Sequence, residues 1–407
     1  MADLSLGPAP GPARLVLRDP SLRLAAIVLA LQGAVICSYM PYVSDLAVHR
    51  FGFGDAGYAV ILALASAVSV VSAVAVGIRT DQTARRRGMA ARAAAALVLA
   101  MALMSLLPAA WSFVLVAVVL MPFAGTIFGQ VFAMARLAAF AHPPAARDGV
   151  MSVIRALLAA PFVVVLPLWS LAFAAGAGVM AVFPVSLVVA LVMLAVILRL
   201  WPRDGRAPWA EAPSGLSSRA ALAEIGRPRT LLRVIALGAV NAGPTLYMAL
   251  TALVLGQVPG RGAGDVALYV GLVAGLEVPF MLLFPALMRA VPRQQGILIG
   301  AGLYALHLGL MPWLAHGPWL WLLVLPAAMG GALTLTLPIA YLQDLLHDRP
   351  GAGASLMAVQ RLSGDVIAAL CFAAGTLLSG YALAAAFGVV VSLAGALALL
   401  IADRHRA

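Results

Sequence analysis

The chain of 407 residues is 64% hydrophobic and only 10% charged, and its formal net charge is +11. This balance, with a mean hydropathy of +1.04, excludes a soluble globular domain, and the continuous apolar runs exclude a transmembrane β-barrel. The predicted fold class is therefore an all-α membrane protein. The two cysteines, Cys37 and Cys371, each lie inside an apolar run, so we expect neither a metal site nor a structural disulfide.

The chain begins with a segment rich in Pro, Gly and Ala and without hydrophobic periodicity over residues 1–20, which predicts a disordered leader on the cytoplasmic side, ending by residue 23. Apolar segments of membrane-crossing length then follow at residues 24–46, 56–78, 89–108, 111–135, 150–172 and 177–200. We assign residues 24–200 to an N-terminal six-helix bundle. No small-residue cleavage site follows the first segment, so we interpret it as a retained span.

A polar segment at residues 201–230, with several prolines and arginines, divides the chain and predicts a linker on the cytoplasmic surface. Further apolar spans follow at residues 231–256, 266–288, 295–314, 317–342, 354–378 and 380–402. Residues 231–402 thus form a predicted C-terminal six-helix bundle, and a basic tail over 403–407 ends the chain. The start of the fifth span, Val150–Arg155, weakly resembles the start of the eleventh, Leu356–Arg361, which supports two parallel repeats.

The loop from Gly77 to Arg92 fixes the orientation. It carries Arg79, Arg85–Arg87 and Arg92 against one acid, Asp81, and so dense a positive loop between two spans stays in the cytoplasm. By alternation, both termini and the linker are expected on the same side. All 26 basic residues are arginine, and most lie at this side, so topology explains the charge and no nucleic-acid partner is expected. The arginine- and alanine-rich composition suggests a bacterial inner membrane protein.

Charged residues within the spans are costly by a few kcal/mol and are therefore candidates for function. Glu277 lies near the middle of the eighth span, with no charged residue within a turn. It is either protonated or paired with another helix, and the alternative is a structural carboxyl facing a polar cavity. Arg361 and Asp365 share one face of the eleventh span and form either a local ion pair or part of a coupling site. Arg155 has no acid within reach on its own helix.

Uncharged polar residues are spread over four spans and suit a neutral polyhydroxylated ligand, since amides and hydroxyls offer donors and acceptors without fixed charge. Together with Glu277, the candidate substrate-binding residues are Gln32, Gln130, Asn241, Tyr247, Thr334 and Tyr341. The structural alternative is hydrogen bonding between helices, which contributes less than about 1 kcal/mol per pair.

Several stretches together resemble the sugar efflux transporter family of the major facilitator superfamily. The more specific are Gly275-Leu-Glu-Val-Pro279 and Gln343-Asp344-Leu345. The others are Leu31-Gln32, Gln130–Arg136, Val153–Ala156, Asn241, Tyr247 and Arg349–Ala352, in matching order across nearly the whole chain. The arginine loop resembles only the wider superfamily, and there Gln82 and Ala84 depart from the usual pattern.

The resemblance implies twelve transmembrane helices in two six-helix bundles, the major facilitator fold. Helices 1, 4, 7 and 10 would line a central cavity, and helices 2, 5, 8 and 11 would join the two halves. It also implies export of sugars or sugar-like compounds, driven by the proton gradient. The expected partners are a sugar or glycoside, protons and the lipid bilayer. We expect a monomer with no cofactor and no metal.

A proton-coupling pair follows from this implied packing. Helices 5 and 8 would touch, which would bring Arg155 within reach of Glu277 across the halves, directly or through one water. Protonation of Glu277 would then release Arg155 and loosen the contact. The full set of candidate coupling or gating residues is Glu277, Arg155, Arg361, Asp365, Asp81, Arg85 and Asp344.

The sequence leaves three alternative functions. The nearest is efflux of drugs or other metabolites on the same fold. A membrane-embedded enzyme would need a metal cluster, an activated nucleophile or a phosphate-binding loop, and the sequence has none of these motifs, so we predict no catalytic residues. A sensor or scaffold that transports nothing is separated from a transporter only by a flux measurement.

Overall fold

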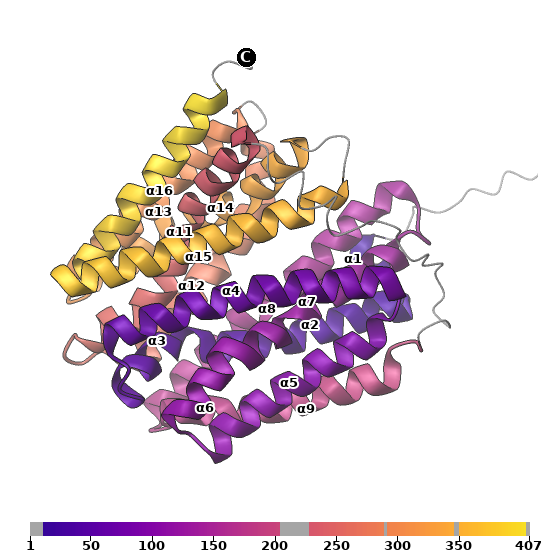
Figure 1. Ribbon diagram of the computed structural model, residues 1–407, viewed down its shortest axis with the longest axis horizontal. Helices are drawn as coiled ribbons and strands as arrows, with labels where there is room; N and C mark the ends of the chain where they lie inside the picture. The colour runs from indigo at the N-terminus through magenta and orange to yellow at the C-terminus, as the bar shows by residue number, and fades with distance from the viewer. Residues whose placement is uncertain (1–10, 204–227, 289–290, 346–349, 404–407) are drawn as a thin grey trace, which may run out of the picture.

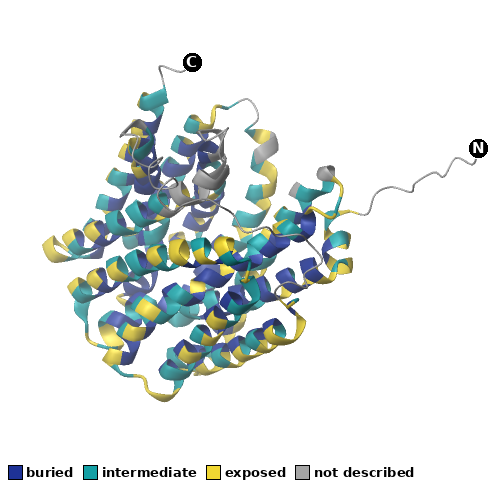
Figure 2. Ribbon diagram, turned by 45° about the vertical axis from the view of Figure 1, so that its right-hand side comes forward, coloured by how far each residue is buried: buried dark blue, intermediate teal, exposed yellow. Residues whose placement is uncertain are grey.

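The computed structural model describes residues 11–203, 228–288, 291–345 and 350–403. Within these residues, 12 helices are long and apolar enough to cross a membrane, as the sequence predicted. The long helices run roughly side by side in two groups, one from each half of the chain (Figure 1). Exposed residues lie mainly on the outer surfaces of these groups, and buried residues lie where helices meet (Figure 2).

The first six spans end before residue 203. They are α2 (Pro20–Tyr39) continued by η1 (Met40–Tyr42), α3 (Val43–Asp45) and η2 (Leu46–Arg50); α4 (Gly54–Thr83); α5 (Arg86–Leu106); α6 (Ala110–Leu115), η3 (Val116–Leu120) and α7 (Met121–Ala139); α8 (Pro144–Ala174); and η4 (Val179–Ala181) with α9 (Val182–Leu200). Asp19 caps the first span, because its carboxylate accepts hydrogen bonds from the Ser21 and Leu22 amides at 2.8 and 3.0 Å.

The second six spans begin after the linker, most of which lies outside the described residues. They are α11 (Pro228–Gly256), α12 (Ala263–Leu287), α13 (Arg293–Leu314), η5 (Pro318–Leu323) with α14 (Val324–Leu345), α15 (Pro350–Leu378) and α16 (Tyr381–Asp403). Several contain a proline, such as Pro244 in α11 and Pro338 in α14, which a membrane helix tolerates when neighbouring groups satisfy the freed carbonyl.

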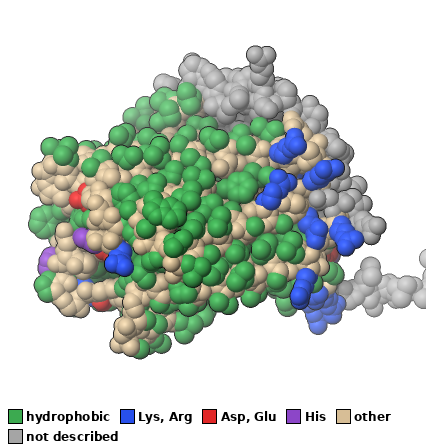
Figure 3. Space-filling model, turned by 60° about the horizontal axis from the view of Figure 1, so that its bottom comes forward, with side chains coloured by type: hydrophobic (Ala, Val, Ile, Leu, Met, Phe, Trp, Pro, Cys, Tyr) green, Lys and Arg blue, Asp and Glu red, His purple; other side chains and the backbone are tan. Residues whose placement is uncertain are grey.

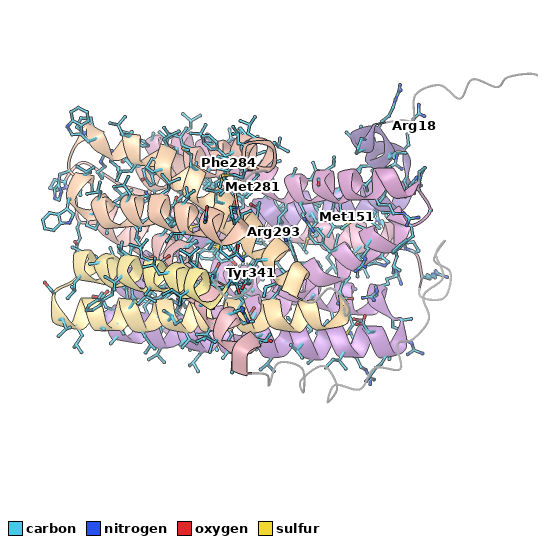
Figure 4. All side chains as sticks on the ribbon, turned by 90° about the horizontal axis from the view of Figure 1, so that it is seen from above. Arg18, Met151, Met281, Phe284, Arg293 and Tyr341 are labelled. Atoms are coloured by element: carbon cyan, nitrogen blue, oxygen red, sulfur yellow. The ribbon has the colours of Figure 1, made fainter. Side chains whose placement is uncertain are left out.

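The leader differs from the prediction. Residues 12–18 form a short helix, α1 (Pro12–Arg18), and α2 already begins at Pro20, so the disorder predicted for residues 1–20 is wrong for the described part. Val16 is buried where α1 packs against α2 and α8, and this contact orders a segment too short to show a periodic pattern. Arg18 points away from the helices (Figure 4).

The two halves are joined by two helix pairs, α8 with α12 and α4 with α15. These are helices 5 and 8 and helices 2 and 11 in span order, the four helices that the resemblance implied would join the halves, with 5 packed against 8. Gly271 allows close approach, because a Cβ there would lie 3.1 Å from the Leu166 side chain and 3.4 Å from the Phe162 carbonyl oxygen.

Contacts between the halves gather at the end of the molecule opposite the arginine loop. There the Tyr42 hydroxyl donates to the Ala263 carbonyl at 3.4 Å, and the Tyr381 hydroxyl donates to Asp55 at 3.0 Å. On the face shown in Figure 3, arginines gather mainly at one end of an apolar belt, while histidine and acidic side chains lie at the other. We call these the arginine-rich end and the opposite end.

Candidate functional site

A polar cluster lies at mid-depth, where α11 meets α15. Asp365 is near the midpoint of α15, and its Oδ1 accepts a hydrogen bond from the Thr245 hydroxyl of α11 at 2.9 Å. Arg361 lies one turn earlier, and its Nε is 3.9 Å from Asp365 Oδ2, which is too long for a hydrogen bond. The predicted Arg361–Asp365 pair is therefore present but loose.

The N-terminal half contributes tyrosines to this cluster. Tyr39 of α2 lies within electrostatic range of Arg361, and Tyr58 of α4 lies within range of Asp365. The Tyr58 ring also packs edge-on against Phe372 of α15, with ring centroids 5.3 Å apart. The cluster thus joins four helices from both halves. Thr245, Tyr39 and Tyr58 were not predicted, because nothing in their local sequence distinguishes them from other hydroxyl-bearing residues of the spans.

Asn241, a predicted ligand residue, lies beside this cluster. It is half-buried one turn before Thr245 on α11, and it packs against the backbone of Gly364, the neighbour of Asp365. A Cβ at Gly364 would lie 3.0 Å from the Asn241 amide nitrogen and 2.7 Å from the Gly238 carbonyl oxygen, so glycine permits the close approach of the two helices. Asn241 and Thr245 therefore share a helical face with access to Asp365.

Glu277 lies elsewhere and does not meet Arg155. Its carboxylate packs against Gly331 of α14, where any added Cβ would collide with it, and it lies within electrostatic range of Tyr247 and Tyr304. Arg155 is exposed and has no ion pair among the described residues. The predicted Arg155–Glu277 pair is thus absent from this conformation: α8 and α12 do pack together, but Glu277 is turned into its own bundle.

Tyr247 and Thr334 also point into the C-terminal bundle. Tyr247 is only 4% exposed and packs among aromatic side chains, with ring centroids 5.1 Å from His307 and 6.1 Å from Tyr304. Its hydroxyl has no hydrogen-bond partner among the described residues. Thr334 donates to the Gly330 carbonyl of its own helix at 2.9 Å. The structure therefore does not bring these two residues to the Asp365 cluster.

Tyr341 belongs to a separate network at the arginine-rich end of the C-terminal bundle (Figure 4). Its hydroxyl donates to Asp403 Oδ2 at 2.7 Å, and Gln294 donates to the same oxygen at 2.9 Å. Arg233 donates to Asp403 Oδ1 at 2.7 Å through Nη2. This network ties together α11, α13, α14 and α16, so Tyr341 is held by its own bundle and is not turned toward Asp365.

The arginine loop forms a third network. Asp81 pairs with Arg86 at 2.8 Å instead of with Arg85, which is exposed. Arg86 Nη1 also lies 3.4 Å from the Gln130 side-chain oxygen, so Gln130 faces this loop and not the Asp365 cluster. Ala84 takes a left-handed backbone conformation, with φ of 52°, to end α4 where a glycine would be unstrained.

Two predicted residues remain, Gln32 and Asp344. Gln32 is buried in α2, and its side-chain oxygen has no hydrogen-bond partner among the described residues. Asp344 lies near the end of α14, but its side chain lies outside the described part of the structure.

Residues 24–369 match the family model of the Major Facilitator Superfamily. The chain belongs to this superfamily. It is a multi-pass membrane transporter of the secondary type, and not an enzyme.

Solved structures agree on the fold. The nucleoside transporter NupG matches with a TM-score of 0.76 at 12% identity, covering 95% of this chain and 99% of that one. A POT family transporter in complex with 5-aminolevulinic acid matches with a TM-score of 0.73 at 12% identity, covering 93% of this chain and 96% of that one. No curated protein sequence matches this chain. At such identities the likeness concerns the fold alone.

Proposed function

We propose that this superfamily member exports sugars or sugar-like compounds by alternating access, in exchange for protons. The observation that carries the proposal is the Asp365 cluster, a hydrogen-bonded carboxylate at mid-depth where residues of both halves come within range. A transport site must be reached from each side in turn, and such sites lie near the membrane midplane between the repeats. Export is the direction that the resemblance to sugar efflux transporters implies.

The polar groups around Asp365 support a hydroxyl-rich ligand. Asn241 and Thr245 offer an amide and a hydroxyl on α11, and Tyr39 and Tyr58 bring hydroxyls within range from the other half. Each of these groups can donate or accept hydrogen bonds, as sugar hydroxyls require. This set replaces most of the ligand residues expected from sequence, because Tyr247, Thr334 and Tyr341 are turned into the C-terminal bundle.

The orientation is part of the proposal. The arginine-rich end would face the cytoplasm of a bacterial inner membrane, with both termini on that side, because arginines are retained there. Since the described contacts between the halves gather at the opposite end, this conformation would be the one that opens toward the cytoplasm.

Coupling to protons requires a carboxyl in the space between the halves. We assign this role to Asp365, because it lies within electrostatic range of Tyr58 of the other half, whereas Glu277 is packed against Gly331 inside its own bundle. Protonation would remove the charge that holds Arg361 nearby and would change which conformation is favoured.

The test compares Asp365→Asn with Glu277→Gln in proteoliposomes. The substrate is first found by screening purified protein against mono- and disaccharides, since a ligand that binds only the folded state raises its melting temperature. Asp365→Asn should still exchange labelled substrate across the membrane but lose accumulation driven by a pH gradient, while Glu277→Gln should keep both. Full gradient-driven transport by Asp365→Asn would exclude this role, and its loss in Glu277→Gln would transfer the role to that residue.

A further inference from the structure

Arg361 is a charged residue that neither faces the lipid nor forms a close ion pair. Its side chain is 71% exposed although α15 crosses the membrane. Leu370, a 64% exposed leucine of the same helix, lies about two and a half turns further on and hence on the opposite face. An exposed leucine on a membrane-crossing helix is expected to face lipid, so we infer that Arg361 faces the space between the halves, in agreement with its electrostatic effect on Tyr39 of α2.

Arg155 occupies the equivalent place in the N-terminal half. It follows the first residue of α8, Pro144, by about three helical turns, as Arg361 follows Pro350 of α15. Val164, which is 60% exposed, lies about two and a half turns beyond Arg155, again on the opposite face. The weak repeat in the sequence thus places one exposed arginine on each half, at matching depth and away from lipid.

The positive charge of these two arginines is incompletely balanced by the described residues. Arg155 has no ion pair among them. Arg361 approaches Asp365 only through Nε at 3.9 Å, and Asp365 is also hydrogen-bonded to Thr245. The terminal nitrogens of Arg361 therefore have no described hydrogen-bond partner, and these nitrogens form the fork that binds carboxylate or phosphate oxygens in pairs.

We propose that the transported sugar-like compound carries a carboxylate or phosphate group, and that Arg361 binds it with Arg155 as the second positive contact. This inference rests on the proposed transport function and narrows its substrate class from sugars in general to anionic sugars. A bound anion would also offset the repulsion between the two arginines when the halves approach at the arginine-rich end. The hydroxyls of the same ligand would meet Asn241, Thr245 and Tyr39.

The test measures ligand-induced thermal stabilisation of the purified full-length protein with glucuronate, glucose 6-phosphate and neutral glucose at constant ionic strength. Glucuronate, glucose 6-phosphate or both should raise the melting temperature more than glucose does, and the stronger of the two identifies the group as carboxylate or phosphate. The Arg361→Gln variant should weaken binding of that compound by roughly tenfold or more, since a charge-assisted bond is lost. Arg361→Lys should retain part of the affinity because the charge remains.

The matched control is Arg92→Gln. Arg92 is another exposed arginine, and its guanidinium bonds only to the Gly88 carbonyl of its own helix among the described residues, so its removal should leave affinity unchanged. Gel filtration and the melting temperature without ligand establish that each variant is folded, and Arg155→Gln provides an independent second variant with the same expected direction.

The outcomes separate the two proposals. Stabilisation by glucose equal to that by its acid and phosphate, absence of a shift with either anionic sugar, or unchanged affinity in both arginine variants overturns the anionic substrate class. Transport of neutral sugars alone would overturn that class while leaving the transport function standing. Arginine-dependent binding of glucuronate without any flux in proteoliposomes would support the anion site and overturn the proposed transport.

Discussion

At the scale of single residues, two polar side chains within the spans fit because a glycine on the neighbouring helix leaves room for them. Glu277 fits between α12 and α14 because residue 331 is glycine, and Asn241 fits against α15 because residue 364 is glycine. Each glycine lets a polar group pack closely against the backbone of a neighbouring helix. The position of each polar group is therefore set by the helix that faces it as much as by its own helix.

Gly331→Ala should lower the melting temperature of the purified protein, because the added methyl group collides with the Glu277 carboxylate. The cost of such overpacking is about 1–3 kcal/mol. The double variant Gly331→Ala with Glu277→Ala should recover much of the loss, since the two residues are in contact. Gly125→Ala is the matched control, because a Cβ at Gly125 in α7 meets nothing within 4 Å. Equal losses in Gly331→Ala and Gly125→Ala would show that the collision is not the cause.

At the scale of elements, the arginine loop connects four helices. Asp81 at the end of α4 pairs with Arg86 at the start of α5, and Arg86 also reaches Gln130 of α7. Arg87 adds a hydrogen bond to the Leu198 carbonyl of α9 at 2.6 Å. Exposed ion pairs contribute little to stability by themselves, so the expected role of this network is to hold helix ends in one conformation.

Asp81→Asn should slow transport more than it weakens substrate binding, because the expected role of the loop contacts is to hold one conformation while the binding residues lie at mid-depth. The measurement is the initial rate of flux in proteoliposomes beside the affinity from thermal shift. Arg85→Gln is the control, since Arg85 does not form the described Asp81 pair and its loss should leave both quantities unchanged. Equal loss of flux and affinity in Asp81→Asn would exclude a gating role.

At the scale of the whole molecule, the two halves are held together at the opposite end. The Tyr381–Asp55 and Tyr42–Ala263 hydrogen bonds lie there, and the Tyr58–Phe372 ring contact lies between that end and the Asp365 cluster. A transporter that alternates must break these contacts when it opens toward that end. Their strength therefore sets how often the opposite conformation is populated.

Tyr381→Phe should increase the population that opens at the opposite end, because it removes the hydrogen bond to Asp55. A net loss of about 0.5–1.5 kcal/mol would raise that population roughly two- to tenfold. Cys371 is a natural probe, since it is buried and adjoins Phe372 in the sequence of α15. In a Cys37→Ala background, its alkylation should accelerate by the same factor. Tyr341→Phe is the matched control, because its hydroxyl bonds to Asp403 at the arginine-rich end, and acceleration in both variants would indicate general loosening.

The sequence by itself determined the membrane class and the 12 spans, and it predicted a central linker and an orientation. These properties depend on local composition, since a continuous apolar run of sufficient length must form a helix in lipid, and arginines between spans are retained on one side. The weak repeat between two short segments was also visible in the local sequence, and it identified Arg155 and Arg361 as equivalent residues. The mid-span charges were recognised because charge in an apolar run is costly wherever the helix packs.

Only the tertiary structure decided what each polar side chain faces. The positions of Glu277, Tyr247 and Tyr341 along their spans give their depths in the membrane. The rotation of a helix about its axis, however, depends on packing against several neighbours. The structure turns Glu277 toward Gly331 and Tyr341 toward Asp403, and it assembles the cluster of Asp365 and Thr245 from helices far apart in the chain. Helix formation satisfies the backbone within one segment, whereas a site between helices exists only after several segments have packed.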